Sequence, residues 1–323
     1  MAKALNTTTE MPHIKFLANQ TSSTYLAANL RIIARMGAIS AGICSILKTY
    51  SRIAPTERGG YRLARLARSL IGKDQWSKQW TTPAGLHMKL NLATYPDCCM
   101  VFGLYELDTT RQMRRLLRPG DWFVDCGANI GYFTLLMARH VGATGQVDAF
   151  EPDPMNRATL LANLKSNALD TRVRAHDLAL GNHGGMVDLF HPTQSKSNHG
   201  MSSLYPDGSG LDTKFSVQIA RLDDVLKGVP NLVKIDIEGA ELAAIEGMSR
   251  MLQSPNPPSL IVEHNPASCA SAGHLPSDLM RLLQRIQPRY RVFFIDWKLQ
   301  PIISPNMLDH MPRQGNLLIT PAA

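Results

Sequence analysis

Cysteine is scarce in this chain of 323 residues, and the few cysteines follow no pattern of disulfide or metal binding. Their number is odd, two are adjacent, and the spacing CxxC does not occur, so neither a disulfide framework nor a zinc ribbon is predicted. A reducing compartment suits such a chain, and we predict a cytoplasmic protein, with membrane association left open. The cysteines are Cys44, Cys98, Cys99, Cys126 and Cys269.

Long uncharged apolar runs are also lacking. The stretch 25–50 is moderately apolar but contains Arg31, Arg35 and Lys48, which is too much charge for a membrane span of about 20 apolar residues. It also begins too far into the chain for a secretory signal peptide. We interpret it as an amphipathic helix, followed by a second helix at 61–70.

Acidic residues are rare in one part of the chain only. Residues 1–80 hold 12 Lys and Arg against three acids, whereas the other 243 residues hold 22 against 23. The nearly neutral body therefore has no general attraction for nucleic acid, and no nucleic-acid partner is predicted. We predict a basic, helical extension at 1–84 and one domain at 85–323. The extension is interpreted as a solvated cap, with contact to an anionic membrane or glycolipid surface and a transit peptide as alternatives.

Short β-branched or apolar runs alternate with amphipathic segments of helical length from about residue 85 onward, which is typical of a parallel α/β sheet. Because several runs end in an acidic residue, we predict a Rossmann-like, doubly wound sheet with ligands at the carboxyl ends of its strands. Strands are expected at 121–125, 146–150, 172–175, 232–236, 260–263, 291–295 and 317–319, helices at 132–141, after Pro154, at 240–252 and around 279–283, and an added hairpin at 186–190 and 215–220.

A glycine-containing turn follows the first of these strands. Asp125 ends the strand, Gly127 and Gly131 flank the turn, and Glu151 ends the next strand. Glycines let the backbone approach a ligand closely, and a carboxylate at the second strand's end can accept hydrogen bonds from both ribose hydroxyls. The predicted cofactor-binding residues of this region are Asp125, Gly127, Ala128, Asn129, Gly131 and Glu151.

Two cofactors suit this arrangement, a dinucleotide and S-adenosylmethionine. A dinucleotide site needs GxGxxG, so that a pyrophosphate can rest at the helix N-terminus, and 127–131 lacks that triad. Asp125 would repel a pyrophosphate but suits the ammonium group of a methionine moiety, so S-adenosylmethionine is favoured. A glycine turn without a nucleotide is the alternative. Asp177, after the third strand, is predicted to accept a hydrogen bond from the adenine amino group, with a plain surface turn as its alternative.

Six sequence fragments occur in a particular order. They are FVDCGANIGYFTLLMARHVG at 123–142, AFEPDP at 149–154, ALG at 179–181, GMSSL at 200–204, VKIDIEGAELAAIEGM at 233–248 and LIVEHN at 260–265. In this order they resemble the FkbM family of class I methyltransferases. The resemblance spans about 103–319, and KIDIEGAE is its most specific part.

The resemblance implies a seven-stranded sheet with one antiparallel strand and S-adenosylmethionine as the methyl donor. It also implies methylation of a hydroxyl group on a small molecule or glycan. The family is similar across sugar, lipid-linked saccharide and polyketide acceptors, so the resemblance does not identify one acceptor. The expected partner is therefore a small-molecule or glycan hydroxyl acceptor.

A hydroxyl nucleophile gains about 10²–10⁴-fold in rate from a general base. His264, which ends the fifth strand beside Glu263, is our first choice, because the unperturbed pKa of histidine is near neutral. A hydrogen-bonded structural histidine is the alternative. Asp236, which ends the fourth strand, is expected to shape the donor and acceptor sites, and Glu238 lies at their mouth. The predicted catalytic residues are thus His264, Asp236 and Glu238, and Asp236 is counted among the cofactor-binding residues as well.

Two further features stay open. Asp236, Glu238, Glu263 and His264 form an oxygen-rich set that could hold a divalent cation, but nothing in their spacing demands one, and no metal is predicted. An apolar stripe is expected in the helix at 240–252, so its two glutamates, Glu241 and Glu246, are predicted to face solvent. In the inserted loop, an acceptor lid and a hydrogen-bonded hairpin turn are equal interpretations of His199, Ser202 and Ser203.

Three other classes of protein are disfavoured. Amino-methyltransferases of nucleic acids usually have an Asn/Asp-Pro-Pro-aromatic turn after the fourth strand, whereas this chain has DIEG at 236–239. A non-catalytic binding or scaffold protein on a methyltransferase fold tolerates loss of the acidic and glycine positions, and all of them are present. An NAD-dependent oxidoreductase is more remote, because GxGxxG is missing.

Overall fold

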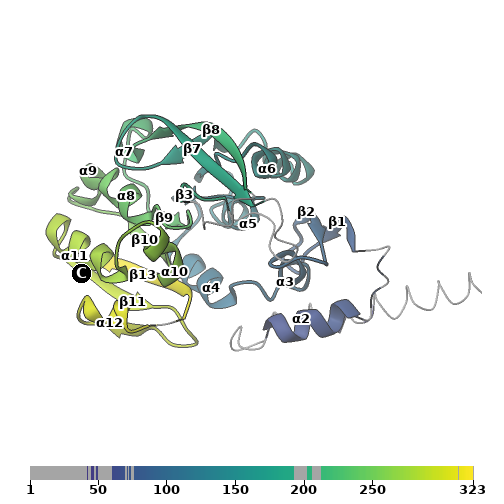
Figure 1. Cartoon of the computed structure of the whole chain (residues 1–323). Coiled ribbons are helices and arrows are strands. Elements are labelled where there is room, and N and C mark those ends of the chain that lie inside the picture. Colours follow the sequence, from purple (N-terminus) through teal and green to yellow (C-terminus); the bar gives the residue numbers. More distant parts are fainter. Residues whose placement is uncertain are drawn as a thin grey trace, which may run out of the picture.

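A mostly parallel sheet with helices on both faces forms the body of the protein (Figure 1). The computed structural model describes residues 60–69, 71, 73, 76–192, 202–205, 212–311 and 313–322, together with Gly42, Ser45, Ile46 and Thr49. Of the helix expected within 25–50, only these last four residues are described, and they are helical, whereas the loop residue His199 lies outside the described residues.

The central sheet has eight strands in the order β12-β11-β13-β10-β9-β3-β4-β5. Five strands, from β10 to β5, run parallel, and β13 lies antiparallel between β10 and β11. The predicted doubly wound α/β sheet is therefore confirmed, and the short edge strand β12 is an addition. The strands are β3 (Trp122–Cys126), β4 (Gln146–Phe150), β5 (Val173–His176), β9 (Leu232–Ile235), β10 (Ser259–His264), β11 (Tyr290–Phe294), β12 (Gln300–Ile302) and β13 (Gly315–Pro321).

Alternate side chains of the strands bury against two helical layers. On β3, for example, Phe123 joins a core cluster with α5 and α6, whereas Val124 joins a second cluster with α8 and α11. The helices are α3 (Asp97–Phe102), α4 (Leu107–Leu116), α5 (Tyr132–His140), α6 (Pro154–Ser166), α7 (Leu222–Val225), α8 (Glu241–Glu246), α9 (Ser249–Leu252), α10 (Pro266–Ser271), α11 (Pro276–Ile286) and α12 (Asn306–Asp309).

The single helix predicted at 240–252 is wrong in one respect, because the structure breaks it into α8 and α9. Gly247 lies at the break, where an added Cβ would come within 1.9 Å of the carbonyl oxygen of Gly181. The new helix begins beside Asp223, whose carboxylate accepts hydrogen bonds from the backbone N–H groups of Arg250 and Met251. A capping acid supplied by α7 therefore restarts the helix.

The added hairpin predicted near 186–220 is confirmed as part of a small second sheet. Its strands follow the order β6-β8-β7, with β7 and β8 antiparallel and β6 parallel to β8. The bounds are β6 (Leu178–Leu180), β7 (Gly185–Pro192) and β8 (Asp212–Ala220).

The helix predicted at 61–70 is confirmed as α2 (Gly60–Ser69), which packs on α3 through the small residues Ala64 and Ala67. A hairpin of β1 (Ser77–Thr81) and β2 (His87–Asn91) follows. The boundary predicted at residue 84 falls inside this hairpin, and the division into two parts stays a prediction. In the part of the chain that the structure describes, no helix has the length and apolarity needed to cross a membrane.

Candidate active site

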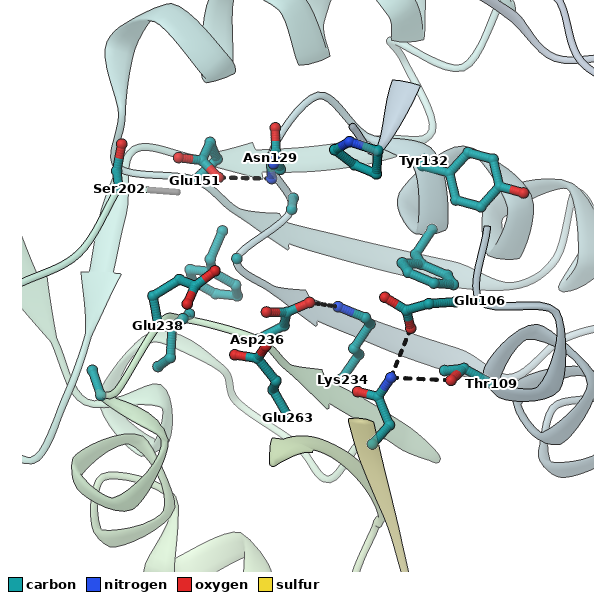
Figure 2. A pocket seen from close by; sticks show the side chains of 18 of the residues that line it. Glu106, Thr109, Asn129, Tyr132, Glu151, Ser202, Lys234, Asp236, Glu238 and Glu263 are labelled. Atoms are coloured by element: carbon teal, nitrogen blue, oxygen red, sulfur yellow. Dashed lines mark hydrogen bonds and ion pairs between the residues drawn. The ribbon is translucent and has the colours of Figure 1, made fainter. Parts of the chain in front are cut away.

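A cavity of about 360 Å³ opens at the carboxyl ends of β3, β4, β9 and β10 (Figure 2). Ligands of doubly wound sheets bind in this place, and the volume lies within the range of about 300–1,000 Å³ that is usual for small-molecule sites. Among the lining residues, carboxyl groups outnumber cations by three to one. The acids are Glu106, Glu151, Asp236, Glu238, Glu263 and Asp296, and the cations are Lys234 and Arg313.

The turn after β3 borders this cavity, and its backbone has a left-handed conformation at three residues. Gly127, Asn129 and Gly131 all have positive φ angles, of 83°, 50° and 93°. A Cβ on Gly127 would come within 1.8 Å of the carbonyl oxygen of Asp236, and one on Gly131 would meet Leu160 at 2.5 Å. Close approach to the protein's own chain therefore explains the need for both glycines. Gly127 and Asn129 line the cavity, as does Ala128 between them.

Glu151 is held at the edge of the cavity, just beyond the end of β4. Its carboxylate accepts hydrogen bonds from the backbone N–H groups of Asn129, at 2.7 Å, and Asp153, at 3.0 Å. Burial raises the pKa of Glu151 to about 8. Beside it lies an apolar wall, formed by Phe150, Pro152, Leu178, Ala179 and Leu180.

Two of the predicted cofactor-binding acids do not line the cavity. Asp125 is buried behind the turn, where its Oδ2 accepts a 2.6 Å hydrogen bond from the hydroxyl of Thr134. Burial raises the pKa of Asp125 to about 6. Asp177 is exposed at the surface and pairs with Arg157 at 3.7 Å. The structure thus corrects the expected position of Asp177, because β6 turns the adjacent Leu178 toward the cavity instead.

A buried lysine, which the sequence patterns did not single out, lies among the carboxylates. The ammonium group of Lys234 pairs with Asp236 at 2.7 Å and lies 4.7 Å from the centre of the Phe133 ring. Burial alone lowers the pKa of Lys234, but the surrounding carboxylates, led by Asp236 and Glu106, raise it above its ordinary value. The ammonium therefore stays charged and balances part of the acidic cavity. A lysine inside the apolar strand LVKI is the signal that identifies it.

Glu106 reaches the same cluster from the start of α4. Its φ of 43° is unusual for a residue other than glycine, and its Oε2 accepts a 2.7 Å hydrogen bond from the side-chain amide of Asn316. Strained residues that the surrounding structure holds in place are common at functional sites. Figure 2 shows the Glu106 carboxylate on the opposite side of Lys234 from Asp236.

Glu238 and Glu263 complete the acidic side of the cavity beside Asp236 (Figure 2). One carboxylate oxygen from each of the three acids lies within 4.8 Å of the others. Burial, with the Asp236 charge second, raises the pKa of Glu238 to about 7 and that of Glu263 well above its usual range. Ser268 donates a 3.1 Å hydrogen bond to Glu238.

Glu241 was predicted to face solvent, but this prediction is wrong, because the structure buries the residue. Its carboxylate accepts hydrogen bonds of 3.0 Å from the backbone N–H groups of both Ile237 and Gly239. These contacts hold the loop between β9 and α8, where Glu238 has a positive φ of 52°. The hydroxyl of Ser203 donates a 2.7 Å hydrogen bond to the carbonyl of Glu238 and supports the loop from the other side.

The inserted loop also borders the cavity. Ser202 lines it, and its hydroxyl donates a 2.5 Å hydrogen bond to Asp153. His191 on β7 reaches the same carboxylate oxygen at 2.6 Å. Ser202 and Ser203 are therefore hydrogen-bonded in the way that the turn interpretation describes, and Ser202 also lies where the lid interpretation places it.

His264 does not enter the cavity, although it was our first choice of general base. It is 3% exposed, its Nε2 lies 3.2 Å from the carbonyl oxygen of Met311, and its ring packs edge-on against Phe294. Neighbouring residues of a strand face opposite ways, so that Glu263 lines the cavity and His264 does not. Burial also lowers the pKa of His264. The structure supports the alternative interpretation, a hydrogen-bonded structural histidine.

We therefore expect His264→Ala to act on stability and to spare turnover. Loss of a buried hydrogen bond and of ring packing should lower the free energy of unfolding by about 1–3 kcal/mol. Chemical denaturation measures this change, and kcat should stay within about twofold of the wild type at a temperature where both proteins are folded. A large fall in kcat with unchanged stability would restore His264 as a candidate base.

A doubly wound sheet with a cavity at its strand ends defines a Rossmann-like α/β protein, the class in which ligands usually bind at these ends. The family described as "Methyltransferase FkbM domain" matches residues 125–290, just over half of the chain. The chain belongs to this family.

Three curated relatives and one solved structure are similar to this chain. Methyltransferase 1 of Beauveria bassiana is 33% identical over 40% of this chain and 59% of its own length. The 31-O-demethyl-FK506 methyltransferase FkbM of Streptomyces tacrolimicus is 30% identical over 41% and 61%, and the hexuronic acid methyltransferase AglP of Haloferax volcanii is 30% identical over 55% and 67%. The chain thus spans about three fifths of the length of most of these relatives. The methyltransferase FkbM structure from Methylobacillus flagellatus aligns at 20% identity over 63% of this chain and 44% of its own, with a TM-score of 0.43.

Proposed function

We propose that this protein transfers a methyl group from S-adenosylmethionine to a hydroxyl group of a sugar, glycolipid or polyketide-type molecule. The observation that carries the proposal is the acidic cavity at the strand ends, which has Glu151 on one side and Glu238 on the other. The family of the chain and the methyltransferase names of its relatives support it.

The residues of the cavity fit this donor. Glu151 presents a buried carboxylate for ribose hydroxyls, and the adjoining apolar wall suits the flat face of an adenine. The carboxyl groups that are ionised favour a cationic ligand, and the excess of carboxyl groups over cations disfavours the pyrophosphate of a dinucleotide. Glu263 Oε2 is buried and accepts no hydrogen bond from the described residues, so a cationic or hydroxyl-bearing ligand can satisfy it. When bound, S-adenosylmethionine supplies a methyl group activated by its sulfonium.

Glu238 is the residue we assign as general base. Its pKa of about 7 lets the carboxylate be ionised near neutral pH and still take up a proton from an acceptor hydroxyl. Asp236 is less suited to this role, because its charge is committed to the ion pair with Lys234. We assign Asp236 and Lys234 to holding the acceptor in place beside the donor, since methyl transfer is an in-line displacement that depends on alignment.

The acceptor side of the cavity has two kinds of surface. Tyr95, Tyr105 and Tyr132 supply aromatic rings, and the carboxylates at the ends of β9 and β10 supply hydrogen-bond acceptors. Rings pack well against the apolar faces of sugars and other cyclic alcohols, and carboxylates accept hydrogen bonds from their hydroxyls. A carboxylate acceptor would meet like charges here, so the hydroxyl assignment is favoured.

Donor binding and methyl transfer test this proposal together. S-adenosylmethionine at about 100 times its Kd should stabilise the protein by about 2.7 kcal/mol and raise Tm by several degrees, whereas NAD should not. Mass spectrometry of sugar and polyketide alcohols incubated with protein and donor should then detect a methyl ether. A Tm increase with NAD alone, or a methyl ester as the product, would contradict the proposal.

A further inference from the structure

Helix α2 lies at the edge of the molecule (Figure 1). Its outer face exposes both large apolar side chains and arginines. Ala64 and Ala67 are buried on its inner side, whereas Leu66 is 62% exposed and Tyr61 is 45% exposed. Arg62 and Arg65 are exposed between them. Large apolar side chains exposed together with arginines are typical of helices that lie in the interfacial region of a membrane.

The chain around α2 is basic throughout. Only one acid, Asp74, occurs in residues 60–91, and the six Lys and Arg there are Arg62, Arg65, Arg68, Lys73, Lys78 and Lys89. Arg68 donates hydrogen bonds to the carbonyls of Leu92 and Ala93, so it fixes the helix to the hairpin and the other two arginines of α2 remain on its outer face. This face is complementary to an anionic surface.

A row of tyrosines joins α2 to the cavity. The ring centres of Tyr61 and Tyr95 are 5.3 Å apart, those of Tyr95 and Tyr105 are 6.2 Å apart, and those of Tyr105 and Tyr132 are 5.5 Å apart. The last three of these tyrosines line the cavity. Tyr61 on the outer face of α2 therefore contacts Tyr95, which lines the cavity.

We infer that α2 docks on an anionic lipid surface and brings the mouth of the cavity to an acceptor anchored in that surface. The second half of this inference rests on the proposed function, and it identifies the acceptor as the hydroxyl-bearing head group of an amphiphile. Each arginine near an anionic bilayer contributes about 1 kcal/mol, and partial insertion of Leu66 and Tyr61 adds to this. The attachment is thus reversible and weakened by salt.

Sedimentation of the full chain with lipid vesicles tests the docking. The protein should bind vesicles that contain about 30% phosphatidylglycerol and should not bind pure phosphatidylcholine vesicles. The double variant Arg62→Gln/Arg65→Gln should weaken binding by roughly 25-fold, and Leu66→Ser should weaken it further. The matched control is Arg285→Gln/Arg291→Gln, because both arginines are exposed on α11 and β11, away from α2 (Figure 1).

Three outcomes would overturn this inference. They are equal binding by the α2 variants and the wild type, equal binding to neutral and anionic vesicles, and full displacement from vesicles by an equal charge of duplex DNA, which would indicate unspecific attraction to polyanions. The α2 variants should keep the Tm increase with S-adenosylmethionine, since these residues do not line the cavity. Loss of vesicle binding with the donor effect intact therefore separates this inference from the proposed function.

Discussion

Replacing Glu238 by glutamine should lower kcat by about 10²–10⁴-fold and leave the Kd of the methyl donor nearly unchanged. The amide has nearly the shape of the carboxyl group and can still accept the hydrogen bond from Ser268, but it cannot take up the proton of an acceptor hydroxyl. Steady-state and single-turnover kinetics measure the loss, because they separate chemistry from binding.

The pH profile gives an independent sign of the same role. A base must be deprotonated, and the pKa of Glu238 in the free protein is raised to about 7, so kcat/KM should fall tenfold per pH unit below about pH 7 and level off above it. Glu238→Gln should abolish this inflection. Glu246→Gln is the matched control, because Glu246 lies on the same α8 but does not line the cavity. A wild-type profile in Glu238→Gln would assign the base to another group.

Replacing Glu151 by alanine should weaken donor binding by about tenfold to more than a hundredfold. Each of the two hydrogen bonds from the ribose hydroxyls contributes about 0.5–1.5 kcal/mol, and the variant also removes the acceptor for the N–H groups of Asn129 and Asp153. Isothermal calorimetry with S-adenosylmethionine measures the change in Kd. Glu151→Gln keeps one acceptor oxygen and should lose less affinity than the alanine variant.

Asp177→Asn serves as the control for donor binding, because Asp177 is exposed and pairs with Arg157 outside the cavity. Its Kd should equal that of the wild type. If Asp177→Asn weakens binding as much as Glu151→Ala does, the donor lies further toward β6 than we propose. If neither variant changes the Kd, the site does not hold the donor.

Most strands and helices could be predicted from local patterns. The strand predicted at 146–150 matches β4 residue for residue, and the helix predicted at 132–141 differs from α5 by one residue. Both segments are mainly apolar runs of the length typical of a strand or a helix, and glycine or proline residues flank them, which are local signals. The edge strand β12 carried no such signal, since it has three residues and includes Pro301.

The residues of the site were predicted less completely. The glycine turn and Glu151 were found because their spacing along the chain reflects the geometry of a strand, a turn and a helix. Asp177 and His264 were placed by their position after a strand, which indicates the correct edge of the sheet but not the side on which a residue lies. Lys234 and Glu106 were not assigned to the site, because the sequence does not show which distant residues become neighbours.

The sequence by itself determined the doubly wound sheet, the glycine turn after β3 and the acids at the strand ends, because each depends on residues close together in the chain. Tertiary structure decided how these parts are used. It placed Lys234 between Asp236 and Glu106, buried Glu241 under the loop that carries Glu238, and directed His264 away from the cavity. These results depend on contacts between distant segments and on burial, which shifts the pKa values of the carboxyl groups. The predicted acid-lined edge thereby became a cavity that Glu238 lines and His264 does not, which is why we propose Glu238 as the base.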